Sequence, residues 1–398
     1  MEMDQDYRAK MVQVLDELRQ TSRSRILTPA RPLEGMAVER QGRRLINFSS
    51  NDYLGLARDP RLAEAAADAG RLGVGATASR LVCGTFPVHQ ALEQALSGLK
   101  GTAAALVMGS GFQTNAGVLA ALFDPEVAGS APLVFIDRLA HASMYEGLRL
   151  AGARPLRFRH NDLGHLGELL AKHGGEPRFR LILSESVFSM DGDRADLPGL
   201  TALARSHDAL LYVDEAHATG VLGPGGAGLC AEPGVKGQVD LVMGTFGKAL
   251  GGYGAFVACE ALLHDWLVNR CRSFIYSTAL PPPVAAAALQ ALALIPLLDA
   301  ERGRLLEQGD RVRRALHRLG IDTLASDTQI IPAIIGSDAD TLAAARLMEA
   351  AGILAVGIRP PTVPAGTGRL RLTLTAAHTA ADLDQLLQAF QSLGRAGA

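Results

Sequence analysis

Short apolar segments alternate with helical patterns through most of the chain, and this alternation limits the fold more than any other feature. The predicted strands span 103–108, 133–136, 155–158, 180–183, 210–213, 241–243 and 255–258. The predicted helices that separate or precede them span 60–72, 88–99, 112–122, 142–151, 163–172 and 198–206. Apolar strands separated by helices predict a mostly parallel, doubly wound α/β sheet with helices on both of its faces.

The two ends of the chain show other patterns. Residues 4–20 place Tyr7, Met11, Val14 and Leu18 on one face, which predicts an amphipathic helix. A short strand is predicted at 45–48. The C-terminal region has a mixed pattern, with predicted helices at 283–298, 301–318, 339–351 and 380–393 and predicted strands at 330–335, 353–358 and 369–374. We therefore expect three parts, namely an N-terminal helix and arm (1–47), a large domain (48–284) and a small α+β domain (285–398).

Charge and cysteine content exclude several classes of protein. The formal net charge is -2 over 398 residues, so no basic field favours nucleic acid or an anionic membrane. The N-terminus is acidic and lacks the apolar core of a signal peptide, and no clean apolar stretch of about 20 residues predicts a membrane span. The four cysteines show no CxxC spacing, and no histidine pair has metal-ligand spacing. We therefore expect a cytoplasmic protein without a metal site.

Lys248 follows the apolar segment 240–244 on a glycine-flanked turn, Thr245-Phe246-Gly247-Lys248. Burial at the end of a strand disfavours the ammonium form of a lysine. A neutral amine is a nucleophile toward carbonyl groups, and its commonest biological use is a Schiff base with an aldehyde cofactor. The alternative is a surface lysine on a mobile loop, so the choice depends on the other residues of the site.

Two glycine-rich turns compete for a phosphate-binding role. The segment Gly73-Val74-Gly75-Ala76-Thr77-Ala78 matches the dinucleotide pattern, but a helical segment precedes it where that pattern requires a strand. The segment Gly109-Ser110-Gly111-Phe112-Gln113-Thr114 lies between a strand and a helix, where free amides and the helix dipole suit a phosphate monoester. We prefer the second turn, and its alternative is an ordinary strand–helix connection.

Acidic and histidine side chains follow two of the predicted strands. Asp214 and His217 come after the strand 210–213, and His141 comes after the strand 133–136. The carboxyl ends of strands face the ligand crevice in an open α/β sheet. Asp214 at the end of an apolar run needs a cationic partner, and a pyridinium nitrogen would serve. His141 could stack on a planar cofactor or act as an acid, whereas a helix cap is the alternative role of Asp214.

Two further polar residues are candidates for ligand contacts. Ser189 follows the strand 180–183, and a contact from it is a better interpretation than calcium, because only Asp191 and Asp193 fit a calcium loop. Prolines follow Arg359 and stiffen its backbone, which suits a guanidinium that binds a carboxylate in a bidentate manner. A solvent-facing arginine on a rigid loop is the alternative.

Taken together, these residues resemble the α-oxoamine synthase family of pyridoxal 5'-phosphate (PLP) enzymes over nearly the whole chain. The motifs that carry the resemblance are Phe48-Ser49-Ser50-Asn51-Asp52-Tyr53-Leu54-Gly55-Leu56, Ser110-Gly111-Phe112, His141-Ala142-Ser143, Phe188-Ser189-Met190-Asp191-Gly192-Asp193, Val213-Asp214-Glu215-Ala216-His217, Thr245-Phe246-Gly247-Lys248 and Tyr276-Ser277-Thr278. The resemblance implies the aspartate-aminotransferase architecture, PLP fold type I. In that fold a large domain contains a mostly parallel sheet, typically of seven strands, between helices. A smaller C-terminal α+β domain and an N-terminal helical segment complete the chain.

The resemblance also implies roles around the cofactor ring. Lys248 would carry PLP covalently and act as the base once it is released. Asp214 would pair with the pyridine nitrogen, and His217 would reach the ring hydroxyl. His141 would stack on the ring face and assist as a proton donor or by orienting a thioester carbonyl. Ser189 would contact the ring region. Lys248, His141 and Asp214 are thus the predicted catalytic residues.

Another group of residues would hold the cofactor phosphate. The resemblance assigns this role to the turn Ser110-Gly111-Phe112, with its backbone amides, and to Thr245. Thr278 would reach the phosphate of the other subunit in a homodimer. The protein would therefore bind its cofactor completely only as a pair of chains.

The segment Ile358-Arg359-Pro360-Pro361-Thr362-Val363-Pro364-Ala365-Gly366-Thr367 is similar to the branch of the family that condenses L-alanine with a pimeloyl thioester in biotin synthesis. The thioester would be carried by coenzyme A or by an acyl carrier protein. Arg359 would bind the amino-acid carboxylate, with Thr362 nearby. Arg25 is the nearest match to the family arginine that meets the acyl carboxylate, and Arg23 is almost as good a match.

One segment departs from the family pattern. Many relatives have a Gly/Ser-rich stretch where this chain has Gly75-Ala76-Thr77-Ala78-Ser79-Arg80, which leaves the acyl-chain preference open. Other reactions also stay open: a second α-oxoamine synthase activity such as glycine C-acetyltransferase (2-amino-3-ketobutyrate CoA ligase), a PLP-fold protein that binds without catalysis, and a nicotinamide dehydrogenase, which the position of the dinucleotide pattern disfavours.

Overall fold

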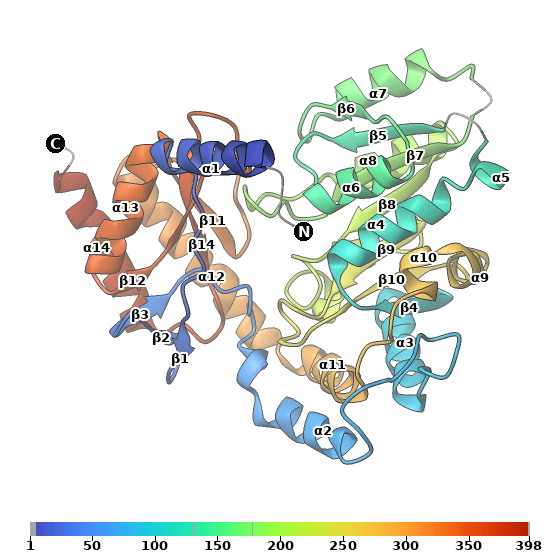
Figure 1. Cartoon of the computed structure of the whole chain (residues 1–398), viewed down its shortest axis with the longest axis horizontal. Helices are drawn as coiled ribbons and strands as arrows, with labels where there is room; N and C mark the ends of the chain where they lie inside the picture. Colours follow the sequence, from blue (N-terminus) through green and yellow to red (C-terminus); the bar gives the residue numbers. More distant parts are fainter. Residues whose placement is uncertain (1–4, 130–131, 177, 397–398) are drawn as a thin grey trace. The chain divides into compact units, whose positions relative to one another are not determined.

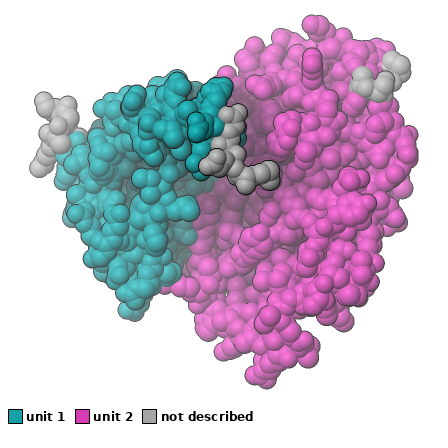
Figure 2. Space-filling view, in the orientation of Figure 1, with its two compact units in different colours: residues 1–50, 190–192, 305–398 teal, residues 51–189, 193–304 magenta. Residues whose placement is uncertain are grey.

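The computed structural model describes residues 5–129, 132–176 and 178–396 (Figure 1). Contacts within the chain divide it into two compact units, coloured separately in Figure 2. Unit 1 comprises Met1–Ser50, Met190–Gly192 and Leu305–Ala398, and unit 2 comprises Asn51–Ser189 and Asp193–Arg304. The N-terminal arm therefore shares a unit with the C-terminal segment, while the three-part division at residues 47 and 284 stays a prediction.

Unit 2 is built around a seven-stranded sheet with the order β4-β10-β9-β8-β7-β5-β6. Its strands are β4 (Ala104–Met108), β5 (Leu133–Asp137), β6 (Leu156–Phe158), β7 (Arg180–Glu185), β8 (Leu210–Asp214), β9 (Leu241–Thr245) and β10 (Ala255–Cys259). Only β10 runs antiparallel to its neighbours, β4 and β9. The predicted mostly parallel α/β sheet is confirmed, and its strands lie close to the predicted bounds.

The helices of unit 2 precede, separate or follow its strands along the chain, and most of them lie where the alternation predicted a helix (Figure 1). They are α2 (Pro60–Gly70), α3 (Pro87–Lys100), α4 (Gly111–Leu122), α5 (Pro125–Ala128), α6 (Ala142–Leu150), α7 (Leu163–Lys172), α8 (Leu197–Ser206), α9 (Ala261–Arg270), α10 (Arg272–Ile275) and α11 (Pro282–Leu294), with 3-10 turns η1 (Leu56–Arg58), η2 (Pro224–Gly226), η3 (Leu229–Ala231) and η4 (Ile295–Leu297). Helix α9 was not predicted, because Leu267 alone is buried among its residues and the apolar period is therefore weak.

Side-chain oxygens start several of these helices where the sequence changes from strand to helix pattern. The carboxylate of Asp162 accepts from the His165 amide at the start of α7, and Asp196 accepts from Gly199 at the start of α8. Ser110 caps α4 in the same way, through the Gln113 amide. Such caps stabilise a helix by about 1 kcal/mol each, and they fix the residue at which each helix begins.

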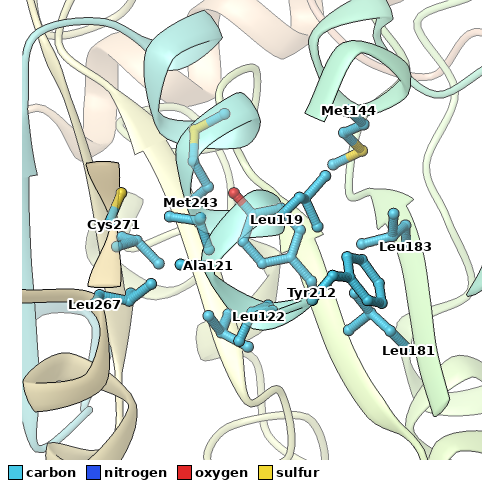
Figure 3. Packing of buried hydrophobic residues seen from close by; sticks show 14 of the residues in the cluster. Leu119, Ala121, Leu122, Met144, Leu181, Leu183, Tyr212, Met243, Leu267 and Cys271 are labelled. Atoms are coloured by element: carbon cyan, nitrogen blue, oxygen red, sulfur yellow. The ribbon is translucent and has the colours of Figure 1, made fainter. Parts of the chain in front are cut away.

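The main core of unit 2 lies where α4 and α6 pack on the sheet (Figure 3). Leu119 of α4, Met144 of α6, Leu183 of β7 and Tyr212 of β8 are fully buried in this cluster. Truncation of one such aliphatic side chain to alanine typically costs about 2–5 kcal/mol. The apolar segments that predicted the strands are therefore also the segments that stabilise unit 2.

Unit 1 combines two smaller sheets with helices. Its elements are β1 (Arg31–Pro32), β2 (Ala37–Arg40), β3 (Arg43–Asn47), β11 (Ile330–Gly336), β12 (Ile353–Leu354), β13 (Val356–Ile358), β14 (Gly368–Thr373), α1 (Gln5–Gln20), α13 (Asp338–Ala350) and α14 (Ala380–Ala396). One sheet has the order β1-β2-β3-β12 and the other β11-β14-β13. The predicted α+β texture is confirmed, although the sequence indicated only β3 of the N-terminal hairpin. The remaining helix, α12 (Asp299–Arg318), begins in unit 2 and continues in unit 1.

Membrane-spanning potential is limited to one bent pair of helices. Among the described residues, no single helix is long and apolar enough to cross a bilayer. The segments Pro282–Leu297 and Asp299–Arg318 meet the length and composition test only together, and they are bent by 77° at their junction.

The parallel strands bring their last residues to one edge of the unit 2 sheet. Glu185 at the end of β7 is in register with Asp214 at the end of β8, and Asp214 is in register with Met243 of β9. Ligand sites of open α/β sheets lie outside this edge. The topology therefore assembles polar strand ends from β7, β8 and β9 at one place.

Candidate active site

A cavity of about 340 Å³ opens at this edge of the unit 2 sheet. Its walls come from the ends of strands β7, β8 and β9, from the first turns of α4 and α6, and from the turn after β9. The lining residues are Ser110, Gly111, Phe112, Asn115, His141, Ser143, Glu185, Asp214, Ala216, His217, Met243, Thr245, Gly247, Lys248, Tyr253 and Gly254. Most residues predicted to hold a cofactor are thus brought together around one space, although they come from four separate segments of the chain.

Asp214 is held in a buried hydrogen-bond network. The side-chain amide of Asn115 donates to Asp214 Oδ2 (2.9 Å) and to Ser143 Oγ (2.9 Å). The hydroxyl of Tyr212 donates to Asn115 Oδ1 (2.5 Å), and the Ala216 amide donates to Asp214 Oδ1 (2.9 Å). Asp214 is 5% exposed. A carboxylate with fixed orientation and little water around it attracts a cation from the cavity strongly.

Lys248, on the turn after β9, is in contact with His217. The Lys248 Nζ atom lies 2.9 Å from His217 Nε2, and His217 Nδ1 lies 2.6 Å from the hydroxyl of Tyr53. Lys248 is half-buried, whereas Tyr53 and His217 are buried. An amine at the wall of a cavity, next to an imidazole, is suited to attack a carbonyl compound.

One corner of the cavity has the properties of an anion site. Ser110 caps α4, so the first amides of that helix face this corner. Gly111 lies so close to β9 that a Cβ atom there would be 2.8 Å from Thr245 Cγ2. The Thr245 hydroxyl is buried and has no hydrogen-bond partner among the described residues. A helix N-terminus beside an unsatisfied hydroxyl suits a phosphate group.

Glu185 places a second carboxyl group in the cavity wall. It is 2% exposed, and its Oε1 atom has no hydrogen-bond partner among the described residues. Burial raises the pKa of Glu185 well above its usual value, and the neighbouring charge of Asp214 acts in the same direction against that of Lys248. Burial therefore favours the neutral form of the Glu185 carboxyl group.

His141 closes another side of the cavity at the start of α6. Its Nδ1 atom lies 2.7 Å from Ser143 Oγ and accepts from the Ser143 amide (3.2 Å). Loss of hydration among the cavity walls lowers the pKa of His141, although the residue keeps some exposed surface, and the charge of Lys248 acts in the same direction. A neutral imidazole with one fixed nitrogen can stack on a planar ring.

A second polar cluster supports the loop that carries Ser189. His160 bridges two buried carboxylates, with Nδ1 3.0 Å from Asp137 Oδ1 and Nε2 2.9 Å from Asp193 Oδ2. The ring also meets the edge of Phe188 at a centroid distance of 4.4 Å. Burial acts against protonation, but the two carboxylates raise the pKa of His160 to about 10. The imidazolium therefore joins the ends of β5 and β6 to Phe188 and Asp193.

Five predicted site residues lie outside the lining of this cavity. Ser189 is buried in the loop after β7, and Thr278 is exposed and forms an isolated antiparallel bridge with Ser79. The others, in unit 1, are Arg25, Arg359 and Thr362. Their proposed roles, like those of the lining residues, stay predictions.

Within unit 1, Arg359 lies beside the N-terminal segment. Its guanidinium donates to the carbonyl of Ser22, and its Nε atom is buried without a hydrogen-bond partner among the described residues. Arg23 forms an ion pair with Asp338 (3.1 Å). Arg25 is exposed, and the described residues include no ion-pair partner for it. The three arginines therefore differ in how much of each guanidinium is already engaged.

Sequence reasoning missed three residues of the site, namely Tyr53, Asn115 and Glu185. Glu185 could have been found by the rule that identified Asp214, because both end a buried parallel strand. Tyr53 was part of a motif but had no assigned role. Asn115 gave no signal, because only the fold brings its α4 position to Asp214. Within the described part of the chain, no group of three or more His, Cys, Asp or Glu side chains could hold a metal ion.

Comparisons with known proteins agree on one family. The model of the aminotransferase class I and II family matches residues 43–390. A relative from Bordetella bronchiseptica is 58% identical over 356 residues, 89% of each chain. The 8-amino-7-oxononanoate synthases of Gluconacetobacter diazotrophicus and Geobacter sulfurreducens are 50% and 47% identical, and the matches cover 96% of this chain and 96% and 97% of theirs.

Solved structures share the architecture. The serine palmitoyltransferase of S. paucimobilis, with a PLP–myriocin aldimine bound, superposes with a TM-score of 0.91 at 29% identity over 99% of both chains. The Sphingomonas wittichii serine palmitoyltransferase also has a TM-score of 0.91, at 30% identity over 100% of this chain and 99% of that one. An 8-amino-7-oxononanoate synthase from Francisella tularensis has a TM-score of 0.75 at 24% identity, covering 89% and 98% of the two chains, and it supports the fold alone.

Proposed function

The chain belongs to the aminotransferase class I and II family, and on that premise we propose that it is a PLP-dependent acyltransferase. The proposed reaction is the decarboxylative condensation of L-alanine with a pimeloyl thioester. Its products are 8-amino-7-oxononanoate, CO2 and the free thiol, as in biotin biosynthesis. The observation that carries the proposal is one cavity that combines a buried acid, an amine and an anion corner, in a chain 50% identical to a relative named for this reaction.

The residues of the cavity fit PLP. Asp214, with Asn115 behind it, suits the cationic ring nitrogen, and Lys248 suits the aldehyde. The unsatisfied hydroxyl of Thr245 and the first amides of α4 suit the phosphate. Gly111 is required there because a side chain would fill the corner. When bound, the cofactor supplies an electron sink for charge that develops on the α-carbon of the amino acid.

Each of the chain's own residues would then have a defined task. Lys248 Nζ would hold the cofactor covalently and, once released by the amino group of alanine, would take the α-proton. Asp214 would keep the ring nitrogen protonated, and His217 Nε2 would donate to the ring hydroxyl oxygen. His141 would stack on the ring and orient the thioester carbonyl, and Ser189 would contact the ring region from its loop.

Two arginines of unit 1 would bind the carboxylates of the substrates. Arg359 would hold the alanine carboxylate, with Thr362 nearby, since its guanidinium is positioned by the Ser22 carbonyl. We assign the pimeloyl carboxylate to Arg25 in preference to Arg23, because Arg23 is already paired with Asp338. The carrier of the acyl group, coenzyme A or an acyl carrier protein, is a matter for assay.

A second copy of this chain would complete the site. Large apolar side chains are exposed at the mouth of the cavity, where Phe112 is 53% and Tyr253 61% exposed, and Tyr276 is 73% exposed next to Thr278. The apolar face of α1 is also exposed, and the helix has no buried residue. A homodimer would cover such surfaces and bring Thr278 to the phosphate of the partner. We place this enzyme in the cytoplasm.

A product assay tests the function. Purified protein with PLP and pimeloyl thioester should release thiol with L-alanine and form 8-amino-7-oxononanoate, identified by mass. Glycine with acetyl-CoA would be the productive pair if the chain were a glycine C-acetyltransferase, and L-serine with palmitoyl-CoA tests the activity that the structural neighbours' names suggest. A protein that binds PLP but turns over none of these pairs would be a non-catalytic member of the fold.

A further inference from the structure

Tyr53, His217 and Lys248 form a continuous chain of side-chain contacts within unit 2. The Tyr53 hydroxyl lies 2.6 Å from His217 Nδ1, and His217 Nε2 lies 2.9 Å from Lys248 Nζ. Tyr53 is 0% exposed and His217 is 5% exposed. A neutral imidazole carries one N–H, so the partner of one ring nitrogen decides whether the other nitrogen donates or accepts.

The backbone holds the two ends of this chain at fixed positions. The turn that carries Tyr53 includes Gly55 at φ 72° and continues to Ala57. The turn that carries Lys248 is closed by a bond from the Gly251 amide to the Lys248 carbonyl (2.9 Å). Gly251 has φ 66°, and a Cβ atom there would lie 2.3 Å from the Ala57 nitrogen. The two turns are therefore packed directly against each other.

We propose that Tyr53 is a positioning residue that keeps the proton of His217 on Nε2, so that Nε2–H donates to Lys248 and favours the neutral amine. The Tyr53 hydroxyl has one hydrogen, and of the two hydroxyl contacts described for it the one with His217 Nδ1 is the shorter. The longer one joins the hydroxyl to Asn51 Oδ1 at 3.2 Å, so the hydrogen belongs to the closer acceptor, Nδ1. Tyr53 therefore donates to Nδ1, which leaves Nε2 protonated.

This arrangement decides which form of the lysine is stabilised. An Nε2–H group donates to the lone pair of a neutral amine, but it cannot accept a hydrogen bond from an ammonium group. If the Tyr53 hydroxyl is removed, His217 can move its proton to Nδ1, and the bare Nε2 then accepts from the ammonium form of Lys248. The same Nε2–H would serve the ring hydroxyl oxygen of the cofactor.

The other titratable groups in the lining of the cavity come from elements that do not carry Tyr53. They are Glu185 of β7, Asp214 of β8, His141 at the start of α6, and Tyr253 in the turn before β10. The inference rests on the proposed function for the role of Lys248 as the amine that takes up a proton. It does not depend on the identity of either substrate.

Nitrogen NMR of the wild-type protein tests the tautomer directly. The PLP-loaded and PLP-free proteins, labelled with ¹⁵N-histidine, should both show His217 protonated at Nε2 and unprotonated at Nδ1, with the signal assigned through His217→Asn. Tyr53→Phe should show a mixture of tautomers. A wild-type His217 protonated at Nδ1 would overturn the proposal. These spectra decide the matter even if the protein turns over no acyl thioester.

The pH profile of turnover gives the second test. Tyr53→Phe should move the rise of kcat with pH by about one pH unit or more to higher pH. At a given pH on the acidic side of the profile, kcat should therefore fall about tenfold, and the KM for L-alanine should stay unchanged. The control is Tyr145→Phe, which removes a hydroxyl bonded to the carbonyls of Asp137 and Arg138 and should keep the wild-type limb. A uniform loss of kcat with an unshifted limb would contradict the proposal and indicate a structural role alone.

Discussion

Asn115 connects Asp214 to Ser143 and Tyr212 through hydrogen bonds, and the chemistry of Asp214 depends on this network. Its amide donates to Asp214 Oδ2 and Ser143 Oγ, and it accepts from the Tyr212 hydroxyl. Replacement by leucine keeps the approximate volume but removes one hydrogen-bond partner from each of these three buried polar groups. Hydrogen bonds to charged groups contribute about 1.5–3 kcal/mol.

We therefore expect Asn115→Leu to lower kcat/KM by about 10- to 100-fold and to weaken PLP retention, measured by the absorbance of the bound cofactor. Asn269→Ala serves as the control, because Asn269 bonds only the Asp265 carbonyl on the exposed side of α9 among the contacts described for it. Equal activity of Asn115→Leu and wild type would show that Asp214 needs no such support.

The protonation of Glu185 should be visible in the pH dependence of stability. Its pKa is raised in the folded protein, so above its usual value the unfolded chain loses a proton that the folded chain keeps. Stability then falls as pH rises from about 4.5, by the linkage relation. Glu185→Gln removes this effect, because glutamine imitates the neutral acid.

The stability difference between Glu185→Gln and wild type should therefore grow in favour of the variant from pH 5 to pH 9, measured by the midpoint of thermal unfolding in PLP-free protein. Parallel pH curves for the two proteins would mean that Glu185 is ionised in the fold. The same pair of proteins should have similar kcat at neutral pH, because burial favours the neutral form of Glu185, which glutamine imitates.

At the scale of elements, His378 ties the C-terminal segment of unit 1 to β3. Its ring stacks on Phe48 at 4.2 Å, Nδ1 accepts from the Thr375 amide (3.0 Å), and Nε2 donates to the Asn47 carbonyl (3.1 Å). Burial lowers the pKa of His378 to about 4. Both ring nitrogens therefore keep their bonding pattern only while the imidazole is neutral.

This histidine should contribute to acid sensitivity. Its folded pKa lies below the unfolded value of about 6.5, so its contribution is complete above that pH and is lost as pH falls toward 4. The loss amounts to about 3 kcal/mol at most. His378→Gln should flatten urea-unfolding stability between pH 6.5 and pH 4 relative to wild type. If the two proteins lose the same stability between pH 6.5 and pH 4, the acid sensitivity of the fold belongs to other groups.

Element types were predictable from the sequence where burial imposes a clear period. The strands of the unit 2 sheet carry continuous apolar residues, because helices cover both faces, and their bounds followed from composition alone. Helix α9 and the β1–β2 hairpin could not be predicted in this way. In α9 only Leu267 is buried, and β1 is exposed along its length, so tertiary contacts rather than pattern define them.

The site was predictable in part for the same reason. Lys248, Asp214 and His141 each follow a recognisable strand and could be placed at the carboxyl edge of the sheet from topology. The partners Asn115 and Tyr53 could not be inferred, because their contacts join residues far apart in the sequence. Pattern identifies the strand end that carries a functional group, whereas packing identifies the side chains that orient it.

At the scale of the whole molecule, the proposed site requires two chains. Val82 is 77% exposed in the segment that leads from Ser79, the bridge partner of Thr278. A charge at such a position should oppose burial between two copies. We expect Val82→Glu to shift the protein from dimer to monomer in sedimentation velocity and to lower PLP affinity, because Thr278 of the second chain is lost.

Leu297→Glu provides the matched control, since Leu297 is 73% exposed and is remote in sequence from the residues of the cavity mouth. It should keep the wild-type sedimentation and PLP affinity. A wild-type monomer with full activity would contradict the two-chain site, although it would leave the proposed reaction intact.

The central claim is that this cavity condenses L-alanine with a pimeloyl thioester and removes the alanine carboxylate. The most direct measurement is mass spectrometry of the products formed from L-[1-¹³C]alanine, PLP and pimeloyl-CoA. The account predicts unlabelled 8-amino-7-oxononanoate together with labelled CO2, and neither from Lys248→Ala protein. Retention of the label in the product, or condensation with glycine or serine but not with alanine, would contradict it.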